Sequence, residues 1–363
     1  MNVNGQNFQT IWADPNNPAR IYVIDQQKLP FAFTIKTLRT FDDARKAIAD
    51  MLVRGAPLIG ITAVYGLYLG MLQEKNRKDL FHFLEERCLE MKATRPTAVN
   101  LAHAVDAFFR AIKDEKDPSS RIRKAFETAE KMRRDEVACS RAIGEKGLPL
   151  IEEIAARKKG EAVNILTHCN AGWLACIDWG TALAPVYCAQ RKGIPVHVWV
   201  DETRPRNQGS RLTAFELQQE SVPFTVIPDN TGGHLMQHGK VDLVLVGSDR
   251  TTCTGDVCNK IGTYLKALAA HDNGIPFYAA MPSSSIDFTL TDGLKEIPIE
   301  ERSPEEIIFL EGKNGTVQVV PDHCPVANYG FDVTPARLVT GLITERGICK
   351  AHPASLSEMF PER

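Results

Sequence analysis

The second half of the chain alternates short apolar runs with segments long enough for helices, and this alternation restricts the fold more than any other feature. Each apolar run has the length of a buried strand and ends in polar or glycine-rich residues. Strands joined by helical crossovers form open parallel sheets. The pattern therefore predicts a doubly wound, mostly parallel sheet. Its strands are expected at Ala162–Leu166, Pro195–Val200, Pro223–Ile227, Val241–Val246 and Ile275–Ala280.

The first half of the chain reads as mainly helical, with a small β element from two short runs at Gln9–Trp12 and Ile21–Ile24. Helical patterns cover Asp42–Val53, Leu58–Gln73, Lys78–Lys92, Asn100–Lys113 and Pro118–Ile143. Gly144, Gly147 and Pro149 then interrupt the pattern. These breaks predict a helical N-terminal domain of residues 1–150 and a sheet domain of residues 151–363. A pair of runs near the C-terminus, Ile307–Leu310 and Thr316–Val320, predicts a hairpin.

Composition argues against several classes of protein. The chain has 363 residues, and 43 lysines and arginines nearly balance 45 aspartates and glutamates, so no basic excess favours nucleic acid. No apolar run approaches the ~20 residues that span a bilayer, and the N-terminus lacks the pattern of a secretory signal. Nine scattered cysteines predict reduced thiols. We therefore expect a cytoplasmic protein without a membrane segment and, because CxxC and HExxH are absent, without a metal site.

Polar loops follow every predicted strand of the second half. Because parallel strands end at one edge of a sheet, the first loop, Thr167–Gly172, and the fourth, Gly247–Arg250, are expected to share a crevice. Cys169 and Asp249 in these loops are candidates for acid-base chemistry. Cys169 has an alternative role in packing, since free cysteines are usually buried and inert. A helix cap explains Asp249 poorly, because no clear helix follows it directly.

The chain lacks the glycine fingerprints of dinucleotide and P-loop sites. Helix N-termini and cations can still hold a phosphate group. Three segments have this character: Arg54–Pro57, Gln208–Arg211 and the pair Asn259–Lys260, which lies near the start of a helical pattern. They predict a small phosphorylated ligand, although Arg54 and Arg211 can equally be members of ion pairs.

Longer motifs point in the same direction. They are RGAPLIG (54–60), THCNAG (167–172), DETRP with QGSRLTAFEL (201–217), GSDR with GDVCNKIGTY (247–264), GIPFYAAMPSSSID (274–287), IPIEER (297–302) and FDVTPARLVTGLITERG (331–347). Together they resemble the methylthioribose-1-phosphate isomerases, a family related to the regulatory subunits of eukaryotic translation initiation factor 2B. The match runs in order over most of the chain.

The resemblance implies a helical domain followed by a Rossmann-like domain, a homodimer, and neither a metal nor a nucleotide cofactor. It implies that 5-methylthioribose 1-phosphate is converted to 5-methylthioribulose 1-phosphate in methionine salvage. Asp249 matches the acid of the family, and Cys169 matches the residue that assists hydrogen transfer, either as a base or by shaping an apolar site for a hydride shift. The positions that match the family's substrate-binding residues are Arg54, Gly55, Ala56, Arg95, Gln208, Asn259 and Lys260.

Some positions depart from the family pattern: Trp173, Cys176, Arg206–Asn207, Thr251–Thr254 and Tyr329–Gly330. They can reshape the wall around the 5-position of the sugar, so the sequence leaves open whether the 5-substituent is methylthio or hydrogen. The alternative to the methylthio sugar is that 5-deoxyribose 1-phosphate is an additional or the preferred substrate. A non-catalytic regulatory protein that binds a sugar phosphate is another alternative, and the presence of both Cys169 and Asp249 speaks against it.

Overall fold

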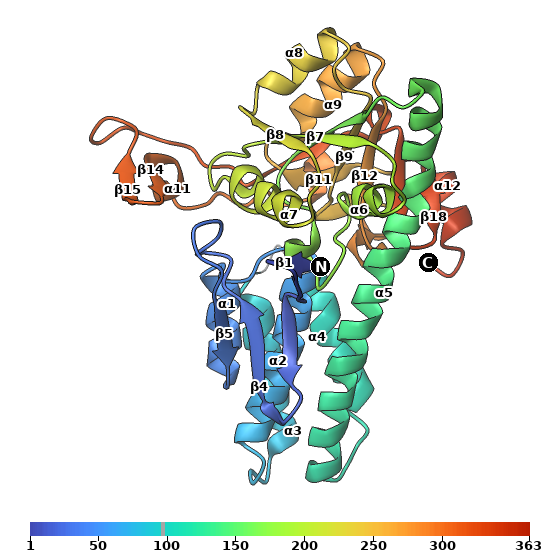
Figure 1. Ribbon diagram of the computed structural model, residues 1–363. Coiled ribbons are helices and arrows are strands. Elements are labelled where there is room, and N and C mark those ends of the chain that lie inside the picture. The colour runs from blue at the N-terminus through green and yellow to red at the C-terminus, as the bar shows by residue number, and fades with distance from the viewer. Residues whose placement is uncertain (96–98) are drawn as a thin grey trace.

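The structure, a computed structural model, describes residues 1–95 and 99–363. A mainly helical N-terminal part lies on one side of the molecule, and a part built around a large, mostly parallel sheet lies on the other (Figure 1). This arrangement confirms the predicted fold class.

The N-terminal part combines an antiparallel three-stranded sheet with a group of helices. The strands are β1 (Asn2–Val3), β2 (Gln6–Asn7), β3 (Ile11–Asp14), β4 (Asn17–Ile24) and β5 (Ile35–Leu38), of which β3, β4 and β5 form the sheet. The helices are α1 (Phe41–Ala49), α2 (Ala56–Gln73), α3 (Leu80–Ala93), α4 (Val99–Ile112) and α5 (Pro118–Lys158). Apart from α5, these helices agree with their predicted positions to within a few residues.

Helix α2 is the central helix of this part. It has 18 residues and a mean hydropathy of 1.4, which is enough by length and composition to cross a membrane. The expectation that no apolar run approaches the length needed to span a bilayer therefore has an exception in this helix. However, 83% of the helix is buried inside the fold, where it packs against α1, α4 and α5. Its apolar surface is therefore that of a core helix.

Helix α5 runs 41 residues from the N-terminal part along the sheet (Figure 1). The predicted end of this helix at Ile143 is wrong, because the helix continues through Gly144, Gly147 and Pro149 to Lys158. The two glycines do not break the helix; they allow close contact with α6 (Ala184–Arg191). The proposed domain boundary between residues 150 and 151 falls inside this helix.

Gly147→Ala is expected to destabilise the protein by about 1–3 kcal/mol, because an added methyl group overpacks a filled interface. A Cβ atom at Gly147 would lie 2.5 Å from Pro185 Cγ and 3.4 Å from Ile343 Cδ1. Urea unfolding of both proteins measures the difference. Gly233→Ala is the matched control, since a Cβ there meets Ala269 at an ordinary 3.6 Å and the helix propensity improves. Equal stability of the two variants would contradict the packing argument.

The large sheet has the strand order β18-β17-β12-β9-β6-β7-β8. Neighbours from β17 to β8 are parallel, and β18 is an antiparallel edge strand. Numbered along the chain, the six parallel strands stand in the order 3-2-1-4-5-6, which is the Rossmann order. The strands are β6 (Val163–Thr167), β7 (Val196–Asp201), β8 (Phe224–Ile227), β9 (Leu243–Val246), β12 (Phe277–Ala280), β17 (Gly341–Thr344) and β18 (Gly347–Cys349).

The five predicted strands are all present, whereas β17 and β18 were not predicted. The other helices of this half are α7 (Ala214–Gln219), α8 (Thr231–Gln237), α9 (Thr263–Asp272), α10 (Gly293–Glu296), α11 (Glu305–Ile308) and α12 (Pro353–Met359). A second, four-stranded sheet was also not predicted. It consists of β13 (Ile286–Asp287), β10 (Arg250–Thr252), β11 (Val257–Lys260) and β16 (Phe331–Thr334). The predicted hairpin is β14 (Phe309–Gly312) and β15 (Gly315–Gln318), which projects from the body (Figure 1).

Candidate active site

The two candidate catalytic residues follow neighbouring strands at the point where the strand order reverses. Cys169 comes two residues after β6, and Asp249 comes three residues after β9. These strands pair directly through Ile165 with Leu243. Doubly wound folds bind ligands at this switch point. Both residues line one cavity of about 40 Å³, as the sequence predicted.

Cys169 occupies an unusual backbone position. Its φ of +67° lies in the left-handed region, which costs a residue with a side chain about 1–3 kcal/mol. Two threonines hold it there: the Cys169 N–H donates to Thr203 Oγ1 at 2.8 Å, and Thr213 Oγ1 donates to the Cys169 carbonyl at 2.8 Å. The residue as a whole is 8% exposed. The loop thus fixes a nearly buried thiol at the cavity wall.

Asp249 lies in an enclosed position near several charges. Burial raises the pKa of its carboxyl group, while the positive charges of Lys260 and Arg54 act in the opposite direction. The net effect is a raised pKa, which favours the protonated acid. The neighbouring Arg250 turns away to Asp287, with Nε 3.1 Å from Oδ2. Arg250 therefore does not neutralise Asp249.

The N-terminus of α2 forms another wall of the cavity. Gly55 caps the helix with a φ of +94°, and a Cβ atom there would lie 2.2 Å from the Ala175 carbonyl oxygen. Only glycine fits this position. Gly55 and Ala56 line the cavity together with Arg54, so the positive end of an 18-residue helix faces it. This arrangement suits a phosphate group.

Arg54 reaches the loop that carries the thiol. Its Nη1 donates to Asn170 Oδ1 at 2.6 Å, and its Nη2 donates to the Asn170 carbonyl at 2.9 Å. Arg95 lines an adjoining cavity of about 40 Å³ with Gly55 and Asp249, and its Nη2 lies 3.5 Å from Glu300 Oε2. Both arginines are thus placed beside the candidate acid.

The predicted position of Asn259 and Lys260 near the start of a helix is wrong. Both residues belong to β11, which pairs with β16, and α9 begins only at Thr263. Asn259 lines the cavity of Cys169. Lys260 lies behind the wall, where its Nζ donates to the Gly330 carbonyl at 2.8 Å. Burial lowers the pKa of Lys260.

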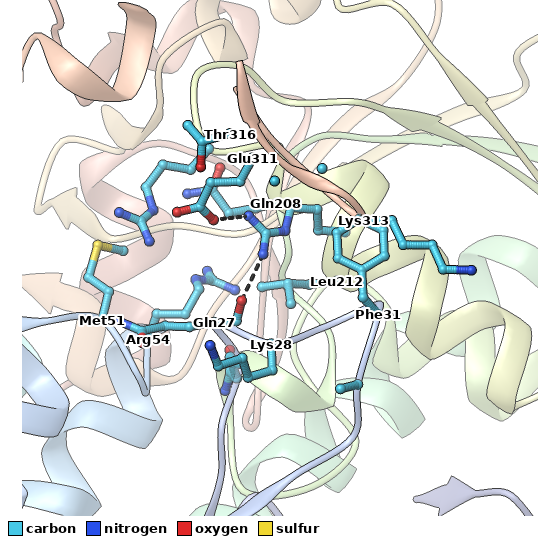
Figure 2. A pocket seen from close by; sticks show the side chains of 16 residues that line it. Gln27, Lys28, Phe31, Met51, Arg54, Gln208, Leu212, Glu311, Lys313 and Thr316 are labelled. Carbon is cyan, nitrogen blue, oxygen red and sulfur yellow. Dashed lines mark hydrogen bonds and ion pairs between the residues drawn. The ribbon is translucent and has the colours of Figure 1, made fainter. Parts of the chain in front are cut away.

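Gln208 lies elsewhere, in a larger cavity of about 500 Å³ between the N-terminal part and the β14–β15 hairpin (Figure 2). Arg54 lines both this cavity and that of Cys169, so the two are neighbours. Arg211 also lines this cavity, where it donates to the Gln27 carbonyl at 2.8 Å and pairs with Glu311 at 2.8 Å. Its ion-pair alternative is therefore confirmed.

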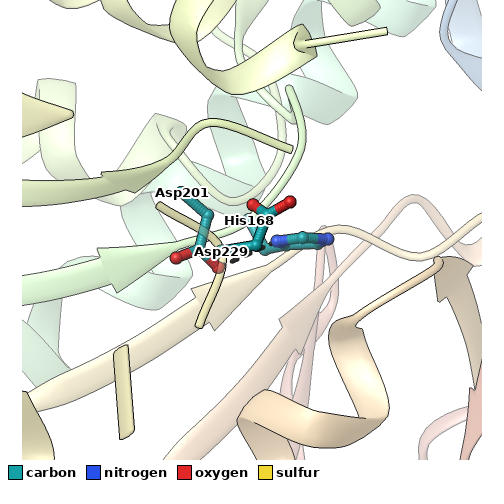
Figure 3. A group of neighbouring side chains, drawn as sticks. All are labelled: His168, Asp201 and Asp229. Carbon is teal, nitrogen blue, oxygen red and sulfur yellow. Dashed lines mark hydrogen bonds and ion pairs between the residues drawn. The ribbon is translucent and has the colours of Figure 1, made fainter. Parts of the chain in front are cut away.

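His168, Asp201 and Asp229 form a compact group whose potential ligand atoms lie within 4.8 Å of one another (Figure 3). His168 Nδ1 is 2.8 Å from Asp201 Oδ2, and its Nε2 is 2.8 Å from the Ile261 carbonyl oxygen. The Lys266 ammonium group lies 3.2 Å from the same Asp201 oxygen. A side-chain cation thus already balances this carboxylate, and we assign the group a structural role.

Several cavity residues were not singled out from the sequence. Asn170, Thr181 and Ser285 line the cavity of Cys169. Ser285 belongs to the loop after β12, and its Oγ accepts from Asn100 Nδ2 at 3.1 Å. The sequence signal for it was present, because this loop leaves the same edge of the sheet. Thr181 carries no comparable signal, since it follows a long irregular segment.

Comparison with known proteins shows the family of this chain. The initiation factor 2 subunit family matches residues 52–351. A methylthioribose-1-phosphate isomerase from Desulfatibacillum aliphaticivorans is 54% identical over 100% of both chains. Another, from Methylobacterium nodulans, is 56% identical over 100% of this chain and 99% of its own. The chain belongs to the methylthioribose-1-phosphate isomerase family. This confirms the resemblance and the expectation that the chain is an enzyme, an isomerase.

Solved structures show the same relationship. The 5-methylthioribose 1-phosphate isomerase from Pyrococcus horikoshii aligns with a TM-score of 0.85 and 35% identity, covering 99% of this chain and 97% of its own. The delta subunit of the translation initiation factor eIF-2B from A. fulgidus aligns with a TM-score of 0.80 and 35% identity, covering 98% and 100%. One fold thus serves proteins described as enzymes and as initiation-factor subunits.

Proposed function

We propose that this chain converts 5-methylthioribose 1-phosphate to 5-methylthioribulose 1-phosphate, as the names of its relatives suggest. The observation that carries the proposal is the meeting of Cys169 and Asp249 in one cavity beside the N-terminus of α2. These groups supply an acid, a thiol and a phosphate anchor. An aldose-ketose isomerase acting on a sugar 1-phosphate needs an acid for ring opening, a group or surface that assists hydrogen transfer and an anchor for the phosphate, and these groups can serve all three.

Asp249 is proposed as the acid that opens the sugar ring. The phosphate on the anomeric oxygen blocks ordinary ring opening, so the bond between C1 and the ring oxygen must break with the phosphate still attached. A protonated carboxyl group can give its proton to the leaving ring oxygen. The raised pKa of Asp249 supports this role, because it favours the protonated form.

Cys169 is proposed to assist the hydrogen transfer from C2 to C1 that follows. As the C2 hydroxyl becomes a carbonyl group, its proton can return to the carboxylate that Asp249 becomes on protonating the ring oxygen. No external oxidant or reductant is needed, because C1 is reduced as C2 is oxidised. A thiolate can take the proton from C2 as a base, which leaves a double bond between C1 and C2, and the thiol can then return the proton to C1. Alternatively, the nearly buried thiol shapes a dry wall beside which hydride moves directly. Its low exposure is compatible with both routes.

The remaining site residues are proposed to hold the substrate. Arg54 and Arg95 can pair with the phosphate, while the free N–H groups at the start of α2 orient it. Asn259 lines the same cavity and can bind a sugar hydroxyl. Gln208 and Lys260 do not line the cavity of Cys169: Gln208 lines the larger cavity, and Lys260 is proposed to act through its charge on Asp249. The larger cavity, which shares Arg54, is proposed as the way in for the substrate.

Turnover of two sugar phosphates tests the function. The purified protein is incubated with 5-methylthioribose 1-phosphate and, separately, with 5-deoxyribose 1-phosphate, and the C2 carbonyl signal is followed by ¹³C NMR. We expect a ketone from the first substrate. A higher kcat/KM for the second would favour the alternative, for which Arg206 beside the larger cavity is the relevant departure. Binding without any ketone would instead favour a regulatory protein, as in the initiation-factor subunits. We also propose a homodimer, which sedimentation tests.

The pH profile of kcat is expected to fall as pH rises through the pKa of Asp249. The acid must carry its proton, so activity is present below that pKa and is lost above it. Lys260→Met removes the positive charge that most strongly lowers this pKa, and the falling limb should then move to higher pH.

Lys131→Met is the control for this shift. Lys131 is exposed on α5 and pairs with Asp135. Loss of the Lys131 charge should leave the falling limb of the pH profile at the same pH. An unmoved limb in Lys260→Met would show that Asp249 does not control the profile.

A further inference from the structure

Glu216 on α7 is a fully buried carboxylate with four hydrogen-bond donors around it. Its Oε1 accepts from Asn170 Nδ2 at 2.8 Å and from Leu174 N at 2.9 Å. Its Oε2 accepts from Trp173 N at 2.9 Å and from Tyr187 Oη at 2.8 Å. A carboxylate that satisfies four buried donors fixes the position of each of them.

Three of these donors belong to one short loop, residues 170–174, directly after Cys169. The loop passes very close to the carboxylate, since a Cβ atom at Gly172 would lie 1.7 Å from Glu216 Oε2. Glycine at this position is therefore a condition of the contact. Glu216 fastens the loop from behind, and it is not among the residues that line the cavity of Cys169 in the described part of the chain.

The contacts of Asn170 carry this constraint to the substrate side. The Asn170 amide nitrogen donates to Glu216, and the amide oxygen therefore faces Arg54. Arg54 uses both of its terminal nitrogens on Asn170, one on the side chain and one on the backbone. Thr213 Oγ1 adds a weaker contact to the amide nitrogen at 3.2 Å. The orientation of the guanidinium group therefore depends on a carboxylate that does not touch the cavity.

We propose that Glu216 is a positioning residue that orients Arg54 for phosphate binding through Asn170. The inference rests on the proposed function in that Arg54 is taken as a substrate anchor. Loss of the carboxylate would release the Asn170 amide, which is then free to turn, and Arg54 would lose its fixed acceptor. The effect would appear in substrate affinity more than in the chemical step.

Glu216→Gln tests this role with little change in volume. An amide nitrogen in place of either oxygen would meet an N–H group as donor against donor, Leu174 N and Asn170 Nδ2 at Oε1 or Trp173 N at Oε2, so the loop cannot keep all of its contacts. We expect KM to rise about tenfold or more, with a smaller change in kcat. Asn170→Ala removes the side-chain acceptor of Arg54 directly and should reproduce the rise in KM, which keeps the test valid if Glu216→Gln folds poorly.

Tyr187→Phe is the matched control. It removes one hydrogen bond from the same buried carboxylate but leaves the three loop contacts. If Glu216 serves stability alone, the two variants should change KM alike at a similar loss of melting temperature. If it positions Arg54, KM should rise in Glu216→Gln and stay near the wild-type value in Tyr187→Phe.

Calorimetry with inorganic phosphate separates this inference from the function itself. Phosphate affinity does not require turnover, so the comparison holds even if methylthioribose 1-phosphate is not converted. We expect weaker phosphate binding in Glu216→Gln and in Asn170→Ala than in Tyr187→Phe. Equal phosphate affinity and equal KM in all of these proteins would overturn the role of Glu216 and leave the isomerase proposal untouched.

Discussion

Asp249→Asn should lower kcat for 5-methylthioribose 1-phosphate by about 10³-fold to 10⁴-fold, the upper range for losing a general acid. Asparagine has nearly the same shape but cannot release a proton to the ring oxygen. The phosphate contacts proposed for Arg54 and the start of α2 do not involve this carboxyl group, so KM should stay within about twofold of its wild-type value. Steady-state kinetics with NMR detection of the ketone measures both parameters.

The control for this variant is Asp272→Asn at the exposed end of α9, which should behave as wild type. An Asp249→Asn protein with substantial kcat would exclude the carboxyl group as the ring-opening acid. A variant in which KM alone rises would point to substrate binding instead.

The second large effect is expected at Cys169. Cys169→Ser should lower kcat by about 10²-fold and change KM little, because the thiol is proposed to act at the reacting carbons and not at the phosphate anchor. Cys169→Ala separates the two routes of hydrogen transfer. If the thiolate is a base, both variants lose activity. If an apolar wall is what matters, alanine should retain more activity than serine.

Reaction in D₂O gives an independent answer. Deuterium at C1 of the product would show that a base carries the hydrogen as a proton and exchanges it with solvent, whereas a direct hydride shift keeps the original hydrogen. For the Cys169 substitutions, the control is Cys324→Ser in an outer loop, which should not change kcat. Wild-type kcat in Cys169→Ser would remove the thiol from the mechanism and leave it a packing role.

Much of the fold could be predicted because its signals are local. The strands β6, β7, β8, β9 and β12 are apolar runs of the right length, and their burial on both faces produces this composition. The meeting of Cys169 and Asp249 followed from one rule about where parallel strands end. The neighbouring order of β6 and β9 did not follow from the sequence, since strand order is set by packing between distant segments.

Other features depend on contacts that a single sequence does not display. The strand β11 is short and mixed in polarity, and it forms because β16, some 70 residues away, pairs with it. Lys260 was therefore assigned to the wrong element. The glycines inside α5 were interpreted as helix breaks. In the structure, Gly144 and Gly147 allow α6 to pack closely against α5. Glu216 lies between two predicted strands, in a segment long enough for a helix, and only the folded loop shows that it is surrounded by donors.

The direct pairing of β6 with β9 has a consequence for how the site can change. The thiol and the acid both follow strands of one hydrogen-bonded sheet, so their separation is set within a single rigid unit. Arg54 and the start of α2 approach from the other half of the molecule. A shift between the two halves of the molecule would change the affinity for a ligand before it changed the distance between Cys169 and Asp249. The affinity for the substrate and the rate of the chemical step can therefore change independently among relatives with this fold.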